Sequence, residues 1–291
     1  MPKNDLRIKI KCLPLIGPLK KTRKRPVSLL TDDERPDQAI LNSRMSFKKL
    51  PEITLLFWAM KIFATTLGET AGDLMSMTFN LGYATSSFIL VGLFFVTVIL
   101  QLLSKSYRPL LYWLVILSTS TAGTTMSDFM DRTLGLGYAK GSLILIVILA
   151  VIFSCWRFSE RSLAVDNIKS TKGELFYWTA ILFSNTLGTA LGDFLADNSG
   201  LGFAGGALLI GSLLTVIILA KWWTKISTVF LFWTAFVLTR PFGATLGDVL
   251  TKSHDKGGLN FGTIGSSTIL AAALVALIIY AQHKQQRTPI H

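Results

Sequence analysis

The chain has 291 residues, of which 51% are hydrophobic and only 16% are charged. Soluble domains usually carry about 25% charged residues, so this composition excludes an ordinary soluble protein and predicts a membrane protein. The formal net charge of +12 does not indicate a nucleic-acid partner, because 13 of the 29 Lys and Arg residues precede residue 53. The lipid bilayer is therefore the expected partner, and no nucleic acid is expected.

The chemistry-bearing residues exclude several classes of protein. The two cysteines, Cys12 and Cys155, and the three histidines show no spacing typical of a disulfide framework, a zinc site or a haem site. No nucleotide-binding loop, nucleophile motif or metalloprotease signature is present in the sequence. The sequence therefore predicts no cofactor and a protein that is not an enzyme.

Residues 1–52 mix charges, prolines and short apolar pieces without a helical or strand period. This pattern predicts a basic, disordered cytosolic arm rather than a signal peptide, because its apolar stretch is short and interrupted. The basic run at residues 20–25 is a solvated charge run or, alternatively, a contact for anionic lipid headgroups. A second interpretation places the start of the protein at Met45, because the segment that follows leads directly into the first apolar span.

From residue 53 onward the sequence is a fourfold repeat. Four tryptophans lie 55, 65 and 55 residues apart, and aligning them also aligns one glycine and one aspartate in every unit without a gap. Repeats of this kind predict a repeat architecture. The predicted units are residues 53–108, 109–156, 174–224 and 225–282, with a cytosolic linker at 157–173 and a cytosolic tail at 283–291. The aligned residues are Trp58, Trp113, Trp178 and Trp233, then Gly68, Gly123, Gly188 and Gly243, then Asp73, Asp128, Asp193 and Asp248.

Each unit contains two apolar stretches separated by a segment rich in Gly and Asp. A stretch such as 175–193 would form a helix of roughly 28 Å, close to the thickness of the hydrocarbon core of a bilayer. These runs are too long and lack the strict alternation of barrel strands. The predicted fold is an all-α membrane protein with eight transmembrane helices, arranged as four parallel two-helix hairpin repeats.

Basic residues in the connections predict the orientation. The arm, the links between repeats and the tail carry 23 of the 29 Lys and Arg residues, whereas the four hairpin tips carry only Arg132, Lys140, Lys252 and Lys256. The positive-inside rule places both termini in the cytosol and the four aspartates near the outer face. The tryptophans that open each repeat are interpreted as an aromatic belt at the cytosolic interface.

The strings TTLGETAGD, NTLGTALGD and RPFGATLGD, with LGY or LGF turns after them, resemble a bacterial family of uncharacterised membrane-anchored or integral membrane proteins. The resemblance covers residues 51–282, which is all of the chain except the arm and the extreme C-terminus. It implies a multi-pass protein of the bacterial inner (cytoplasmic) membrane with this repeat architecture, and it implies no particular chemistry.

Small residues spaced by four predict close helix packing in every repeat. This interpretation accounts for the glycines but leaves the aspartates unexplained, since an acid at the C-terminal end of a helix meets the negative end of the helix dipole. The residues assigned to helix packing are Gly68, Gly72, Gly123, Ser127, Gly188, Gly192, Gly243 and Gly247.

Helical spacing also places oxygen-bearing side chains on one stripe. In the first repeat Thr66, Glu69 and Asp73 lie at i, i+3 and i+7 of a helix. A set of oxygen ligands suits a hard cation or a proton rather than a soft metal. The candidate residues for ion binding or translocation are Glu69, Thr66, Thr121, Thr124, Thr186 and Thr189, together with Asp73, Asp128, Asp193 and Asp248.

Two charged residues break the fourfold pattern. Glu69 has no acidic counterpart in the other repeats, and Arg240 replaces small polar residues. Their opposite signs predict that the first and fourth repeats meet and form an ion pair, with Asp248 as the alternative partner of Arg240. Pro241 predicts a kinked or broken helix.

The remaining charged residues near the spans have simpler interpretations. Lys61 is predicted to extend its ammonium toward the cytosol. Asp131 and Asp197 follow the repeat aspartates closely and are predicted to be solvated residues of the hairpin tips.

Two function classes follow from these patterns. The first is a secondary transporter or exporter of a small hard cation, or of a proton-coupled solute, through an Asp-lined site. The alternative is a non-transporting membrane scaffold, sensor or partner-stabilising protein. In that case the Gly and Asp motifs serve helix packing and hairpin capping.

Overall fold

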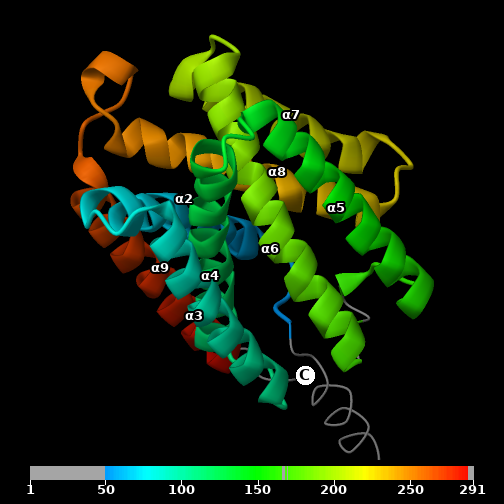
Figure 1. Ribbon diagram of the computed structural model, residues 1–291. Helices are drawn as coiled ribbons and strands as arrows, with labels where there is room; N and C mark the ends of the chain where they lie inside the picture. The colour runs from blue at the N-terminus through cyan, green and yellow to red at the C-terminus, as the bar shows by residue number, and fades with distance from the viewer. Residues whose placement is uncertain (1–49, 166–167, 169, 288–291) are drawn as a thin grey trace, which may run out of the picture. The chain divides into compact units, whose positions relative to one another are not determined.

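The computed structural model describes residues 50–165, 168 and 170–287. The predicted disordered arm, the alternative start at Met45 and the last residues of the predicted tail lie outside the described residues. Within them, every regular element is helical, so the predicted all-α fold is confirmed (Figure 1).

Eight long α-helices account for most of the described chain. The predicted linker is shorter than expected, because α5 continues to Glu160 and α6 already begins at Thr171. The helices are α2 (Leu55–Asp73), α3 (Tyr83–Leu103), α4 (Pro109–Asp128), α5 (Tyr138–Glu160), α6 (Thr171–Asp193), α7 (Gly202–Trp223), α8 (Thr228–Thr251) and α9 (Gly262–Arg287).

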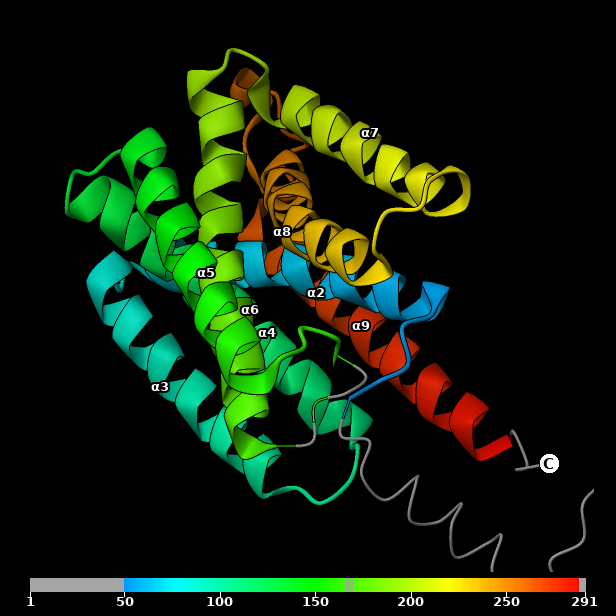
Figure 2. The same cartoon turned by 90° about the vertical axis from the view of Figure 1, so that its right-hand side faces the viewer.

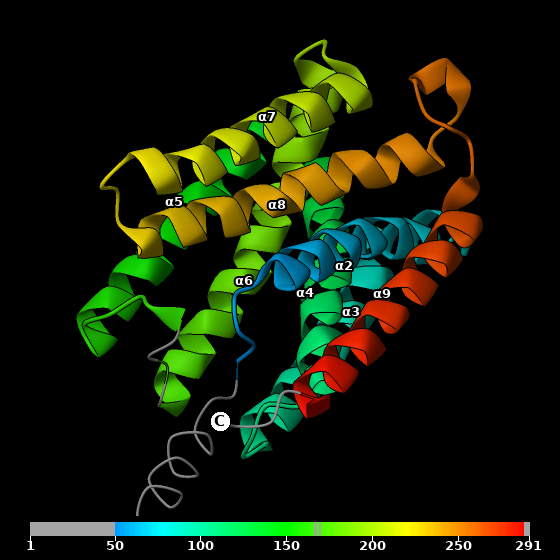
Figure 3. The same cartoon turned by 180° about the vertical axis from the view of Figure 1, so that it is seen from behind.

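The first helix of each repeat belongs to an inner ring. These inner helices, α2, α4, α6 and α8, pack against one another in the closed order α2, α4, α6, α8 and back to α2. Figure 3 shows α8 beside α2, which closes the ring between the fourth and first repeats. The first and fourth repeats therefore meet, as the sequence predicts.

The second helix of each repeat lies outside this ring, on the inner helix of the next repeat. The outer helices α3, α5 and α7 pack on α4, α6 and α8, and α9 packs on α2 (Figure 2). The two helices of one repeat make little contact with each other in the described part of the chain, so the repeats are not packed hairpins. The chain changes direction at glycines with positive φ, such as Gly82 (75°) and Gly137 (71°), a conformation that side chains disfavour.

The motif glycines face the next inner helix around the ring. Gly68 faces Ser120, Gly123 faces Asn185, Gly188 faces Arg240, and Gly243 faces Thr65. A Cβ added at Gly123 would lie 2.9 Å from the backbone carbonyl carbon of Asn185, so only glycine allows this approach. The second small residue of each motif lies four positions later and also faces the next inner helix: Gly72 faces Thr124, Gly192 faces Ala244 and Gly247 faces Glu69. Ser127, which replaces glycine in the second repeat, is buried. The packing role predicted for the glycines is confirmed.

Aromatic side chains close the ring at the N-terminal ends of the inner helices. An aromatic residue of each helix contacts the repeat tryptophan of a neighbour, in the pairs Phe57–Trp113, Tyr112–Trp178, Tyr177–Trp233 and Phe232–Trp58. The hydroxyls of Tyr112 and Tyr177 lie 2.7 Å apart. We call these eight residues the aromatic plug.

The prediction of an interfacial tryptophan belt is wrong. Trp113, Trp178 and Trp233 are only 1%, 1% and 6% exposed, because each packs against an aromatic side chain of the neighbouring inner helix, and Trp58 is half-buried.

The surface of the outer helices is that of a membrane protein. Five helices, α3, α5, α7, α8 and α9, are long and apolar enough to cross a membrane. Large apolar side chains such as Phe88, Leu208 and Ile269 are exposed along the outer helices, far beyond what a soluble surface carries. The more polar α2, α4 and α6 lie in the inner ring, where neighbouring helices cover them.

Pro241 does not break its helix, contrary to one form of the prediction. α8 is continuous from Thr228 to Thr251 and contains Pro241. Membrane helices tolerate proline when neighbouring groups satisfy the freed backbone. Near the proline, the Thr65 hydroxyl of α2 donates to the Thr239 carbonyl at 3.3 Å, which ties this part of α8 to α2.

Candidate functional site

The inner helices place equivalent residues at successive levels along the centre of the ring. Residues four apart lie on the same face of a helix, so every fourth residue returns to the centre. The members of all five levels are buried. From the aromatic plug upward they are the Phe57 level (Phe57, Tyr112, Tyr177, Phe232), the Lys61 level (Lys61, Ile116, Ile181, Phe236), the Arg240 level (Thr65, Ser120, Asn185, Arg240), the Glu69 level (Glu69, Thr124, Thr189, Ala244) and the Asp level (Asp73, Asp128, Asp193, Asp248).

An ion pair between Arg240 and Glu69 lies in the middle of this stack. The Arg240 Nη2 atom is 2.9 Å from Glu69 Oε2, and the two side chains are 0% and 4% exposed. The ion pair predicted from the sequence is therefore confirmed. Asp248, the alternative partner, instead lies against Lys252.

Arg240 contacts all three of the other inner helices. Its guanidinium donates to the carbonyls of Thr65 and Ser120 and to the hydroxyls of Thr124 and Thr189. The same two hydroxyls lie 3.2 and 3.4 Å from Glu69 Oε2. A buried ion pair is tolerated only when further hydrogen bonds satisfy its charges, and this one has them.

The four repeat aspartates gather at the C-terminal ends of the inner helices and are bridged in two pairs. Lys252 Nζ lies 2.8 Å from Asp73 Oδ2 and 3.1 Å from Asp248 Oδ1. Arg132 lies 2.8 Å from Asp128 Oδ1 and 3.3 Å from Asp193 Oδ2. The two basic side chains are 21% and 35% exposed, whereas the carboxylates are 4–5% exposed. Arg132 and Lys252 therefore cover the Asp level on its solvent side.

Sequence reasoning missed this role of Arg132 and Lys252, which it treated only as hairpin-tip charges. The available signal was their position, because each follows a repeat aspartate by four residues, the spacing of a helical ion pair. Burial alone would lower the pKa of the Lys252 ammonium, but Asp248 and Asp73 outweigh burial and raise that pKa above its usual value. Lys252 therefore stays charged at neutral pH.

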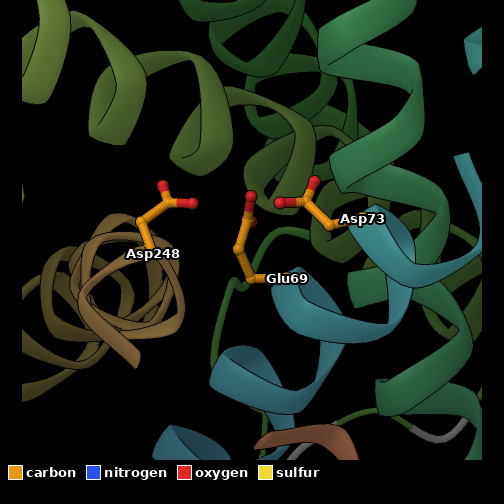
Figure 4. Close-up of side chains that lie close together, drawn as sticks. All are labelled: Glu69, Asp73 and Asp248. Carbon is orange, nitrogen blue, oxygen red and sulfur yellow. The ribbon is translucent and has the colours of Figure 1, made fainter. Parts of the chain in front are cut away.

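Three carboxylates could hold a hard cation. One oxygen each of Glu69, Asp73 and Asp248 lies within 4.8 Å of the others. Figure 4 shows Asp73 and Asp248 facing each other with Glu69 between them. Because Lys252 Nζ bridges Asp73 and Asp248, a metal ion at this place has to displace the ammonium.

The structure brings together only part of the predicted threonine stripe. The hydroxyls of Thr124 and Thr189 reach the Arg240–Glu69 pair. Those of Thr66, Thr121 and Thr186 donate to carbonyls of their own helices at 2.9–3.1 Å. These three residues are therefore outside the charged centre.

Two predictions about isolated charges are wrong and one is confirmed. Lys61 does not reach the cytosol, because it is 0% exposed and its Nζ lies 4.0 Å from the ring centroid of Phe236. Asp131 is buried and accepts a hydrogen bond from Ser127. Asp197 is exposed, as predicted, and accepts a hydrogen bond from Tyr138.

These features define a helical membrane protein in which four sequence repeats enclose a buried charged centre. The chain belongs to the family described as Repeat of Unknown Function (DUF347), which matches residues 56–107, 111–162, 176–227 and 231–288. The predicted membership of an uncharacterised family with four repeats is thereby confirmed. No curated protein and no solved structure matches the chain.

Proposed function

We infer that the protein is a secondary transporter that moves a small hard cation or a proton across the bacterial inner membrane. The observation that carries this proposal is the charge balance of the centre. Five buried carboxylates, those of the Asp level and Glu69, are paired with only three cationic side chains in the described residues: Arg132, Arg240 and Lys252. These ion pairs therefore contain two more carboxylates than cationic side chains.

Uncompensated charge is costly at this depth. The effective penalty for burying one ion in a protein is several kcal/mol, so the two excess charges favour bound cations or protons. The carboxylates supply oxygen ligands only, which suits hard cations.

Access to the centre is one-sided, which also supports transport. The Asp level lies under two partly exposed side chains, whereas the aromatic plug and the Lys61 level cover the opposite end. A transporter needs a central site that is open to one side at a time. Movement of Arg132 or Lys252 would open one side, and separation of the aromatic plug would open the other.

One observation favours the alternative of a non-transporting scaffold. Arg132 and Lys252 each bridge aspartates of two repeats, so the charges also tie the ring together. In a scaffold this bridging and the glycine packing would be the whole role of the motifs.

For the transporter we place all eight long helices across the membrane, with both termini in the cytosol. The polar composition of α2, α4 and α6 does not oppose this topology, because the inner ring is surrounded by apolar helices. Basic residues concentrate at the termini and in the links between repeats, as the positive-inside rule requires of cytosolic segments.

Thiol labelling tests this orientation. In a chain whose Cys12 and Cys155 are replaced by serine, a cysteine at Ser199, on the Asp side, should react with an impermeant thiol reagent added to intact cells. A cysteine at Lys225, which is also exposed but lies in a link between repeats, should be protected. Equal labelling, or labelling of position 225 alone, contradicts the proposed orientation.

Cation binding is tested most sharply with Lys252→Met. Removing the ammonium leaves Asp73 and Asp248 without their bridge, so thermal stability in detergent should fall without added salt. Stability should recover with MgCl₂, CaCl₂ or MnCl₂, since a ligand present at 100 times its dissociation constant stabilises by about 2.7 kcal/mol. Lys256→Met, in the same loop and exposed, is the control and should respond as the wild type does.

Transport itself is measured with the wild-type chain in proteoliposomes, by uptake of Na⁺, Mg²⁺, Ca²⁺ and Mn²⁺ and by an internal pH dye. Uptake above that of empty vesicles, reduced by Asp73→Asn, is the expected result. A chain that moves none of these ions, and whose Lys252→Met variant is not rescued by any of them, is the scaffold.

A further inference from the structure

Lys61 is a buried charged residue that the proposed ion site does not use. It is 0% exposed, and the three other residues of its level, Ile116, Ile181 and Phe236, are apolar. Within the described part of the chain its Nζ has no hydrogen-bond partner, and its described contact is the face of Phe236. A buried ammonium in this state is expensive, so a packing role does not explain a lysine here.

Lys61 lies directly below the Arg240–Glu69 pair. It is one helical turn before Thr65, whose carbonyl accepts from Arg240, and Phe236 is one turn before Arg240 itself. Arg240, from α8, is the charged group facing Lys61, and α4 adds only the neutral phenol of Tyr112 one level below. α9 also packs on α2, and its buried residues in the described chain include the apolar Leu274 and Ile278. No described carboxylate shares the Lys61 level.

Three further polar atoms at the Arg240 level lack partners. Ser120 Oγ, Asn185 Oδ1 and Arg240 Nε are buried and accept or donate no hydrogen bond in the described structure. Buried polar atoms in proteins are nearly always bonded to protein or to ordered water. Two donors and an acceptor at one level are what a small water cluster needs, and water bonded to these atoms would lie between Lys61 and the carboxylates.

We propose that Lys61 is a proton-binding site and that its proton is exchanged for the cation bound at the carboxylates. This inference rests on the proposed transport function and names the counter-substrate. With Lys61 protonated, the five carboxylates and four cations leave one negative charge. With Lys61 neutral and one monovalent cation bound, the net charge is the same, so cation binding and Lys61 protonation compensate each other.

The exchange balances chemically without any further reactant. The N–H bond of the Lys61 ammonium breaks as an O–H bond forms on a water molecule bonded to Ser120, Asn185 and Arg240, and the resulting hydronium ion passes its proton to bulk water on the side from which the cation comes. The cation binds to the carboxylate oxygens, and the Lys61 nitrogen keeps the electron pair of the broken bond as the lone pair of a neutral amine. On the return step the cation leaves to the opposite side, and a hydronium ion from that side gives its proton to the Lys61 amine, which restores the ammonium and leaves a water molecule.

Lys61→Met is the decisive variant. In proteoliposomes containing an internal pH dye, imposed gradients of NaCl, MgCl₂, CaCl₂ and MnCl₂ should drive proton counterflow through the wild-type chain and none through Lys61→Met. Stabilisation of the detergent-solubilised variant by the same salts should persist, and its melting temperature should not fall, because no hydrogen bond or ion pair of Lys61 is lost and the methionine side chain still packs on Phe236. Lys61→Arg keeps a permanent positive charge, so it should lose both proton counterflow and part of the salt-induced stabilisation. Lys221→Met, at an exposed site, is the matched control and should behave as the wild type does.

The outcomes separate this inference from the proposed function. Proton counterflow in Lys61→Met at the wild-type ratio to the cation overturns the role of Lys61 while transport stands. Cation uptake by the wild type without any proton movement does the same. Failure of the wild type to bind or move any of these cations removes both proposals together.

Discussion

Glu69→Gln and Arg240→Gln are each expected to lower the free energy of unfolding by about 3–5 kcal/mol, because each leaves one charge buried without its partner. The double variant should recover much of that loss, since removing both charges of a buried pair can be nearly neutral. The three other inner helices contact Arg240, so the loss should affect the whole ring rather than one repeat. Thermal or denaturant unfolding in detergent measures all three variants.

A double-mutant cycle separates pairing from general damage. If the two residues are partners, the coupling between the two positions should reach or exceed about 3 kcal/mol, the upper end of the range for contacting residues, because each single loss is about 3–5 kcal/mol and the double loss is small. Asp197→Asn, an acid-to-amide change at an exposed site, is the control and should leave stability nearly unchanged. If the effects of Glu69→Gln and Arg240→Gln on the free energy of unfolding are purely additive, the two side chains are not energetically coupled in the folded protein.

The sequence predicted this ion pair because the repeats supply an internal comparison. A charge that appears in one unit only is anomalous against three equivalents, and two anomalies of opposite sign on equivalent helices suggest contact. The same logic predicted the glycine contacts, since small residues at one register allow close approach at every repeat boundary. It could also have found Arg132 and Lys252, which hold equivalent positions in the second and fourth repeats.

Other features were not predictable because two arrangements share one pattern. A tryptophan at the start of a helix fits both an interfacial belt and a buried plug, and the difference depends on which helices are inner. Likewise, the length of a turn does not tell whether an outer helix packs on its own repeat or on the next. The closed ring of inner helices determines both the burial of the tryptophans and the helix on which each outer helix packs. This ring is formed by all four repeats together.

Lys61 illustrates the same limit at a single residue. A lysine eight residues into a span can extend along a lipid-facing surface, and that is the favourable outcome for an outer helix. On α2, an inner helix, Lys61 is instead 0% exposed, and its Nζ lies 4.0 Å from the ring centroid of Phe236 on α8. The placement of the helix, rather than the local sequence, therefore determines that the ammonium is buried.

Gly123→Ala is expected to destabilise the protein, and Gly92→Ala to stabilise it slightly. Alanine is favoured over glycine within a helix by about 0.5–1 kcal/mol, and a Cβ at Gly92 of α3 meets nothing within 4 Å. At Gly123 the added carbon would lie 2.9 Å from backbone atoms of Asn185 and Thr186, which cannot rotate away. Overpacking of this kind costs about 1–3 kcal/mol.

The two substitutions are expected to change the stability in opposite directions, so together they test the close packing of the inner helices. Both changes add one methyl group to a glycine of a long helix, so helix propensity and hydrophobicity change equally, and only the neighbouring helix differs. Unfolding in detergent should place the two variants on either side of the wild type. If Gly123→Ala is as stable as Gly92→Ala, α4 does not approach α6 at this glycine. The level arrangement would then lose its geometric basis, because Asn185 and Arg240 reach the centre only when the inner helices touch.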